Sequence, residues 1–176
     1  MITDINHILL RKSKKWILLI LCSLALFPSC YTFRDISIPP NVKTVRLNYI
    51  ENKAPYVNPQ LSPRLTDRLR QKINNQTRLT LVTAEDAHYE INAVIIDYRA
   101  TTAGISNQQA AINRLNVTVK IIFKNRLDEK ENFEADISRN FDFDANLSLQ
   151  QAEALKGDDI IRNLSDEIFN RIFSNW

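Results

Sequence analysis

Hydrophobic and polar residues alternate along three stretches in the second half of the chain. Every second residue from Leu115 to Phe123 is apolar, and residues 133–143 repeat this pattern with Arg139 as a charged residue on the apolar side. The stretch from Tyr89 to Ala100 begins in phase and slips through residues 94–96, as a β-bulge or burial on both faces would explain. A period of two is typical of antiparallel strands with one wet face, so the pattern predicts three such strands.

Two weaker signals predict further strands nearer the N-terminus. Val45, Leu47 and Tyr49 alternate with polar residues, which indicates a half-buried first strand within residues 42–50. The short apolar segment at residues 79–82 favours one more brief strand.

A first helix is predicted between these two strands. Apolar residues recur every four positions from Leu61 to Ile73, and charged residues occupy the other faces. This spacing predicts a helix with one narrow buried stripe. Ser62–Pro63 suits its start, with proline at the first helical position, and Asn58–Pro59 would serve equally well.

A closing helix is predicted at the C-terminus. The paired carboxylates of Asp158–Asp159 suit a helix N-terminus, and isoleucine and leucine residues follow at helical spacing through residues 161–172. Before it, Ser148 and Gln151 match a capping box that would begin a short helical turn, which Gly157 would end.

These elements together define the expected fold class. The order is strand, helix, short strand, three strands and helix. Every apolar stripe is buried if two helices pack on one face of the sheet. We therefore expect an α+β fold with a mainly antiparallel, mixed sheet of four to five strands.

The N-terminus has the layout of an export signal. Residues 11–15 hold a basic block and residues 16–27 an apolar run that is shorter than the roughly 20 residues of a membrane span. The following Ser29–Cys30 resembles the lipobox of bacterial lipoproteins, whose cysteine is acylated and becomes the new N-terminus. Cys22 is a poorer candidate because Leu21 before it is large, and an uncleaved signal anchor is the alternative. The expected organisation is a removed signal at residues 1–29, a lipidated tether at 30–41 and a single domain at 42–176.

Removing the signal changes the charge balance. The chain has 23 basic and 20 acidic residues, of which residues 1–29 hold four and one, so nineteen of each remain. A neutral domain gives no support to nucleic-acid binding. One cysteine is discarded and Cys30 is lipidated, which excludes a disulfide framework or a cysteine metal cluster within the mature chain.

Catalytic groups are scarce. His88 is the only histidine after the signal, and at a strand start it is best read as a surface or capping residue. Gly104 and Gly157 are the only glycines, which excludes a glycine-rich phosphate loop. Asp142 and Asp144 share a strand face, as a glycosidase pair would, but Ser138 and Asn140 continue the same polar row and indicate a solvated face. The sequence predicts neither a catalytic nor a metal site.

Several short motifs, in their order and spacing, resemble the LptE family of lipopolysaccharide-assembly lipoproteins in its Bacteroidota form. The resemblance covers essentially the whole mature chain. It rests on residues 30–33, 37–45, 58–62, 76–82, 113–120, 132–139, 168–170 and 175–176. Tyr31 stands where many members have glycine after the cysteine.

The resemblance implies a function without catalysis. LptE-like proteins are small α/β lipoproteins on the periplasmic side of the outer membrane. They plug the LptD β-barrel, assist its assembly and bind lipopolysaccharide in transit. We therefore expect an LptD-like barrel and lipopolysaccharide as partners, membrane attachment through Cys30, and no cofactor besides that covalent lipid. A generic envelope lipoprotein that binds a polymer or a protein is the alternative.

Basic residues are the natural contacts for anionic lipopolysaccharide. Arg99 and Arg114 flank an expected mobile loop, residues 101–113, and Lys120 lies farther along the following strand. These three residues are the candidate lipopolysaccharide contacts, with ordinary surface ion pairs as the alternative.

A polar outer face is expected to meet the polar lumen of a barrel. The candidate interface consists of Asn116, Thr118, Ser138, Arg139 and Asn140, although these residues would look the same if they merely faced solvent. Arg139 either pairs with a buried carboxylate such as Asp97 or marks where the apolar face becomes the interface.

Overall fold

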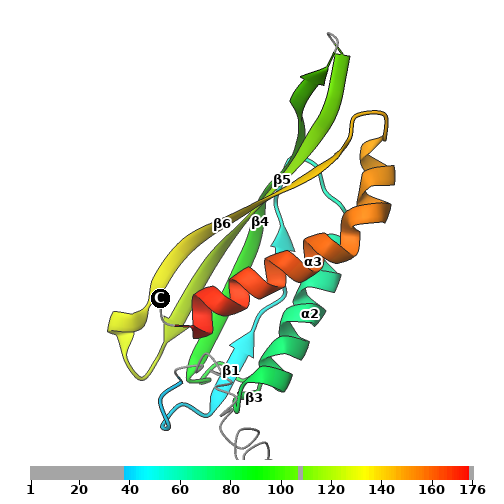
Figure 1. Ribbon diagram of the computed structural model, residues 1–176. Coiled ribbons are helices and arrows are strands. Elements are labelled where there is room, and N and C mark those ends of the chain that lie inside the picture. Colours follow the sequence, from blue (N-terminus) through cyan, green and yellow to red (C-terminus); the bar gives the residue numbers. More distant parts are fainter. Residues whose placement is uncertain (1–37, 107–108, 175–176) are drawn as a thin grey trace, which may run out of the picture. The chain divides into compact units, whose positions relative to one another are not determined.

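A mixed six-stranded sheet forms the centre of the domain in a computed structural model that describes residues 38–106 and 109–174 (Figure 1). Along the sheet the order is β3-β1-β4-β5-β6. The short strand β2 also pairs with β4, on the same edge as β1. The pairings among β1, β2, β3 and β4 are parallel, and β4, β5 and β6 are antiparallel. The strands are β1 (Thr44–Leu47), β2 (Glu51–Asn52), β3 (Thr80–Leu81), β4 (Tyr89–Ser106), β5 (Gln109–Asn125) and β6 (Phe133–Asp144).

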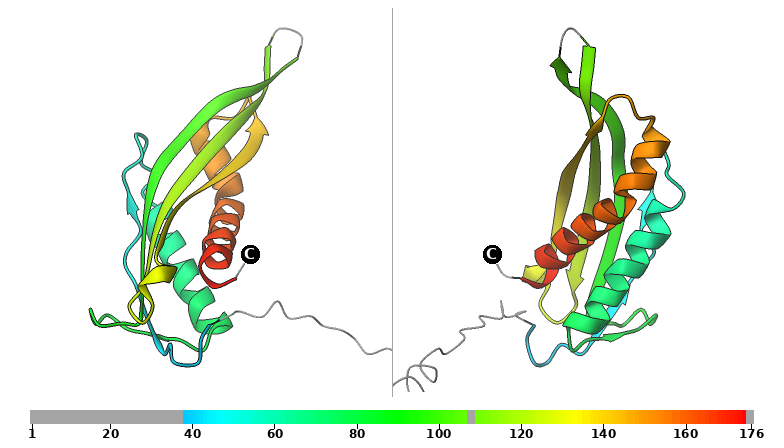
Figure 2. Two further views of the ribbon diagram at one scale, coloured as in Figure 1. Left: turned by 90° about the vertical axis from the view of Figure 1, so that its left-hand side faces the viewer. Right: turned by 45° about the vertical axis from the view of Figure 1, so that its right-hand side comes forward.

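Two helices, α2 (Leu61–Gln76) and α3 (Leu149–Phe173), cover one face of this sheet (Figure 2). The predicted stripe from Leu61 to Ile73 is buried, and it packs in one core with the inward row Leu115 to Phe123 of β5. Leu164 and Ile168 of α3 complete this core. The expected α+β class and the placement of both helices on one face are confirmed.

The three long strands follow the predicted alternation. The slip in the first of them is a β-bulge, because the pairing of β4 with β5 shifts register between Ile95 and Asp97. In β1 the expectation was partly wrong: Val45 and Leu47 are buried, but Tyr49 is 58% exposed and Ile50 is buried in its place. The chain leaves β1 after Leu47, which ends the alternation.

The expected loop at residues 101–113 is instead a continuation of the sheet. Thr101 pairs with Arg114 and Thr102 with Asn113, and the ladder continues through two register shifts around Gly104. The β4–β5 hairpin therefore projects beyond the helices (Figure 1). Apart from Ile105 and Ile112, residues 101–113 are small or polar, so the sequence shows no hydrophobic alternation there.

Neither expected cap begins α2. The N-cap is Gln60, which makes no side-chain cap hydrogen bond, and Asn58 instead shapes the preceding turn by accepting from the backbone N–H of Gln60. Ser62 lies inside the helix, where its carbonyl accepts a hydrogen bond from the Thr66 hydroxyl. The Thr66 hydroxyl oxygen in turn accepts from the Ile50 backbone N–H at 3.1 Å, which ties α2 to the segment between β1 and β2.

The closing helix is longer than predicted. The capping box of Ser148 and Gln151 is confirmed, but it begins one continuous helix rather than a short turn. Gly157 and Asp158–Asp159 lie inside this helix, so the predicted break between them was wrong. Their carboxylates pair with Arg64 of α2 and with Arg162 one turn later, and not with a helix N-terminus.

Candidate functional site

The face of the sheet that the helices leave uncovered, here called the open face, carries the polar rows of β4, β5 and β6. Side chains alternate between faces along a strand. Since the odd-numbered residues from Leu115 to Phe123 are buried under the helices, Arg114, Asn116, Thr118 and Lys120 belong to the open face. The candidate lipopolysaccharide contacts and the candidate barrel-interface residues therefore lie on one surface, with the exception of Arg139.

Four residue pairs of the β5–β6 ladder, every second pair along the strands, are joined by side chains on the open face. Asn116 donates to the Asn140 amide oxygen at 2.7 Å, and the hydroxyls of Thr118 and Ser138 lie 2.8 Å apart. The rungs on either side are ion pairs, Arg114 with Asp142 and Lys120 with Asp136 at 3.1 Å. These polar groups are therefore mutually satisfied before any partner arrives.

Each predicted basic contact has a carboxylate partner. Arg114 binds Asp142 through two hydrogen bonds of 2.6 and 2.9 Å, and Arg99 lies 2.7 Å from the Asp97 carboxylate. The hydrogen bond to Asp142 raises the pKa of Arg114, and the same bond holds the pKa of the Asp142 carboxyl below its ordinary value. An anionic ligand would have to compete with these carboxylates.

Arg139 lies on the other face of β6 and reaches α3, where it forms an ion pair with Glu167. The proposed pairing with Asp97 was wrong, because Asp97 pairs with Arg99 on the open face. Since β6 is an edge strand, an inward-pointing charge there also discourages pairing with another strand.

Beside Arg114 lies an apolar pocket of about 300 Å³ that the sequence did not reveal. Its walls come from the end of β5, the end of β6 and the start of α3. Ile112 is 43% exposed and Leu155 is 69% exposed, while Phe143 lies beneath them. The remaining lining residues are Asp142, Asp144, Leu147, Ala152 and Lys156. Because three distant segments build it, no local motif marks this pocket.

The other functional expectations concern chemistry. His88 has a structural role, since its imidazole Nδ1 accepts from the Lys43 backbone N–H at 3.0 Å and its backbone N–H donates to the Thr44 hydroxyl oxygen. Within residues 38–106 and 109–174 there is no cluster of three His, Cys, Asp or Glu side chains that could hold a metal. The same ranges contain no helix long and apolar enough to cross a membrane. Cys30, the expected lipidation site, lies outside the described residues.

These features define a small α+β domain. Two helices cover one face of its sheet, and the other face is a polar surface whose side chains bond to one another. The family model described as LptE, Lipopolysaccharide-assembly, matches residues 42–172. The chain belongs to this family of outer-membrane lipoproteins, which is not a family of enzymes.

The chain is similar to several solved structures at low sequence identity, and the first two named here share its fold. A minor lipoprotein from Acinetobacter baumannii has 16% identity and a TM-score of 0.52, and the match covers 76% of this chain and 94% of that one. A protein from Xanthomonas campestris has 7% identity and a TM-score of 0.54 over 79% and 88% of the two chains. Rare lipoprotein B from Shewanella oneidensis has 15% identity and a TM-score of 0.47 over 72% and 92%. No curated protein sequence matches the chain.

Proposed function

We propose that this protein is a lipid-anchored component of lipopolysaccharide assembly that binds lipopolysaccharide and associates with an LptD-like β-barrel. The family match over residues 42–172 carries this proposal, because it spans both helices and the sheet. In this proposal Cys30 carries the covalent lipid, and the domain acts on the periplasmic side of the outer membrane. It catalyses no reaction and needs no other cofactor.

Arg114 is the best of the three basic candidates for the lipopolysaccharide site. Lipopolysaccharide combines anionic groups with acyl chains, so its site needs a cation beside an apolar surface. Asp142, the partner of Arg114, lines the pocket that exposes Ile112 and Leu155. Lys156 also lines this pocket, and no carboxylate of the described residues lies within ion-pair distance of it. Arg99 pairs with Asn116 on the open-face rung next to Arg114 and would contact the same ligand farther from its acyl chains. Lys120 lies three open-face rungs from Arg114, about 20 Å along β5, and would reach only a more distant part of the ligand.

The open face is the proposed surface for the barrel. A barrel lumen is polar, and a plug that fills it gains little from apolar burial. Asn116, Thr118, Ser138 and Asn140 already bond to one another, so these hydrogen bonds are kept when water leaves this surface. Arg139 would contribute from the edge of β6, beside Glu167 of α3.

Binding of purified lipopolysaccharide to the full-length protein in detergent tests the ligand part of the proposal. We expect Leu155→Gln and Arg114→Gln each to weaken binding about tenfold, equivalent to roughly 1.4 kcal/mol. Leu127→Gln is the matched apolar control, since Leu127 is 46% exposed outside the pocket, and Arg162→Gln is the matched basic control. If the controls weaken binding as much as the pocket variants, or if no variant does, the proposed site is wrong.

A further inference from the structure

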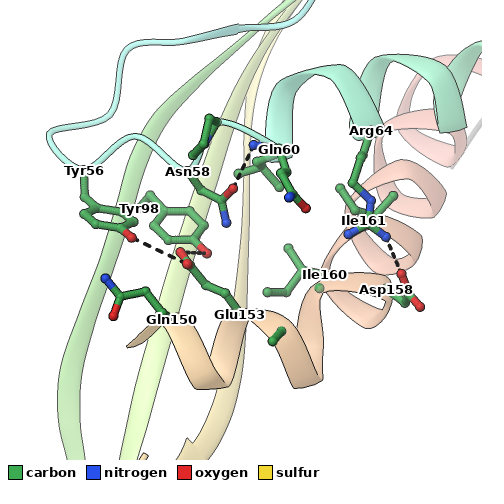
Figure 3. Close-up of a pocket in the computed structure, with 14 residues that line it drawn as sticks. Tyr56, Asn58, Gln60, Arg64, Tyr98, Gln150, Glu153, Asp158, Ile160 and Ile161 are labelled. Atoms are coloured by element: carbon green, nitrogen blue, oxygen red, sulfur yellow. Dashed lines mark hydrogen bonds and ion pairs between the residues drawn. The ribbon is translucent and has the colours of Figure 1, made fainter. Parts of the chain in front are cut away.

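A second cavity, of about 410 Å³, lies on a different side of the first turns of α3 (Figure 3). Its walls are the segment before α2, the start of α2 and the first half of α3. The side chains of Tyr98, Asn58 and Glu153 gather at one end, and Arg64 and Asp158 lie at the other (Figure 3). Neither the family match nor the lipopolysaccharide proposal assigns any role to this cavity.

Glu153 is the chemical centre of the cavity. The Tyr98 hydroxyl donates to one carboxylate oxygen of Glu153 at 2.8 Å, and the Tyr56 hydroxyl lies 3.5 Å from the other. The two tyrosine rings stack with centroids 5.6 Å apart, which holds both hydroxyls toward the carboxylate. Burial, with the nearby Glu153 carboxylate, raises the pKa of Tyr98, so its phenol stays protonated as a donor.

Among the residues that the structure describes, the carboxylate of Glu153 has no counterion. No Lys, Arg or His nitrogen of the described residues lies within 4.0 Å of its carboxylate, although Glu153 is only partly exposed. Arg64, the basic residue of the lining, is engaged by Asp158. The cavity therefore carries one net negative charge, which disfavours a phosphate or carboxylate ligand. A partly buried carboxylate without a counterion attracts a cation.

The other lining residues suit a ligand that has a cation at the end of an apolar chain. The side-chain amides of Asn58 and Gln150 also line the cavity, where the Asn58 oxygen accepts from the Gln60 backbone N–H, and Leu61, Ile160 and Ile161 provide an apolar wall. Such a surface suits the methylene groups of a long basic side chain, whose charged end then reaches the carboxylate.

We propose that this cavity binds an ammonium or guanidinium group on an aliphatic chain, with Glu153 as the counterion. The group comes either from a lysine or arginine of a protein partner or from a free amine. Tyr98 and Tyr56 act as positioning residues, since they orient the carboxylate without contacting the cation. This inference is independent of lipopolysaccharide binding and stands whether or not that proposal holds.

A ligand-observed NMR titration of the full-length protein in deuterated detergent tests the proposal. The probe is n-butylammonium chloride, and 1-butanol is its neutral counterpart. We expect n-butylammonium to bind, and Glu153→Gln to weaken its binding at least tenfold. The amide removes the charge, keeps an acceptor oxygen for Tyr98 and places an NH2 group beside the Tyr56 hydroxyl, which can accept from it. Circular dichroism and Tm should therefore stay unchanged. Glu134→Gln, at an exposed carboxylate on β6, is the matched control and should bind like the unaltered protein.

A second measurement separates the two sources of the cation. If Glu153→Gln also releases a co-purifying barrel, and n-butylammonium competes with that barrel, the cation is a side chain of the partner. If the barrel stays bound while amine binding is lost, the site takes a free amine. Absence of n-butylammonium binding, equal binding by Glu153→Gln, or equal binding of 1-butanol would overturn the proposal.

Discussion

Gly157 sits inside α3, where a glycine normally weakens a helix. Its backbone does not adopt a positive φ, so an L-residue fits the local conformation. A Cβ added there would lie 3.2 Å from one guanidinium nitrogen of Arg64, its nearest neighbour. That contact is with the far end of a flexible side chain, which can move by a few tenths of an ångström.

The expected effect of Gly157→Ala is a small gain in the free energy of unfolding. Alanine is favoured over glycine in a helix interior by about 1 kcal/mol. The opposing cost is a disturbed ion pair between Arg64 and Asp158, whose side chains are 43% and 90% exposed. Pairs this exposed contribute about 0–1 kcal/mol. A net gain of about 0.5 kcal/mol should follow, which raises Tm by about 2 °C for a domain of this size.

Urea denaturation and thermal melts of Gly157→Ala would measure this gain, with Arg64→Ala as the second background. Without the Arg64 guanidinium, the same Gly157→Ala change should stabilise by the full amount of about 1 kcal/mol. If Gly157→Ala destabilises the protein in both backgrounds, α3 is not a continuous helix at this position.

Three further outcomes are expected. Leu164→Ala should lower the free energy of unfolding in urea by about 2–5 kcal/mol, because this fully buried leucine of α3 would leave a cavity; an unchanged midpoint would mean that α3 does not pack on the sheet. Carbon NMR titration should find the Asp142 carboxyl with a lowered pKa that rises towards its ordinary value in Arg114→Gln. Since the folded-state pKa is lowered, the stabilisation by this pair is present above the unfolded-state pKa and is lost as pH falls through the folded-state pKa. Arg139→Val should increase self-association in size-exclusion chromatography, because edge strand β6 loses its inward charge, whereas Arg162→Val should not.

The sequence predicts those elements whose burial repeats with a fixed period. The inward row from Leu115 to Phe123 and the stripe from Leu61 to Ile73 were both identified, because each lies against one continuous core. Alternation also predicts that Asn116, Thr118, Ser138 and Asn140 share a face. The pairing of Asn116 with Asn140 requires the register between β5 and β6, which no local pattern encodes.

The elements that were mispredicted depend on tertiary contacts. Asp158–Asp159 has the composition of a helix start, but Arg64 and Arg162 supply the positive charges that a helix N-terminus would otherwise provide. The β4–β5 hairpin has no apolar row, since its tip projects beyond the core (Figure 1). The cavity around Glu153 unites the segments around residues 56, 98 and 153, so only the folded chain reveals it.

The proposed role in lipopolysaccharide assembly is tested most directly by affinity purification of the full-length tagged protein from detergent-solubilised envelopes. Mass spectrometry would then identify both the co-purifying proteins and the modification of the N-terminus. We expect a near-equimolar large β-barrel of the LptD kind, together with an acylated Cys30 as the first residue. An acylated Cys30 without a barrel would contradict the proposed association and leave an envelope lipoprotein that binds some other polymer or protein.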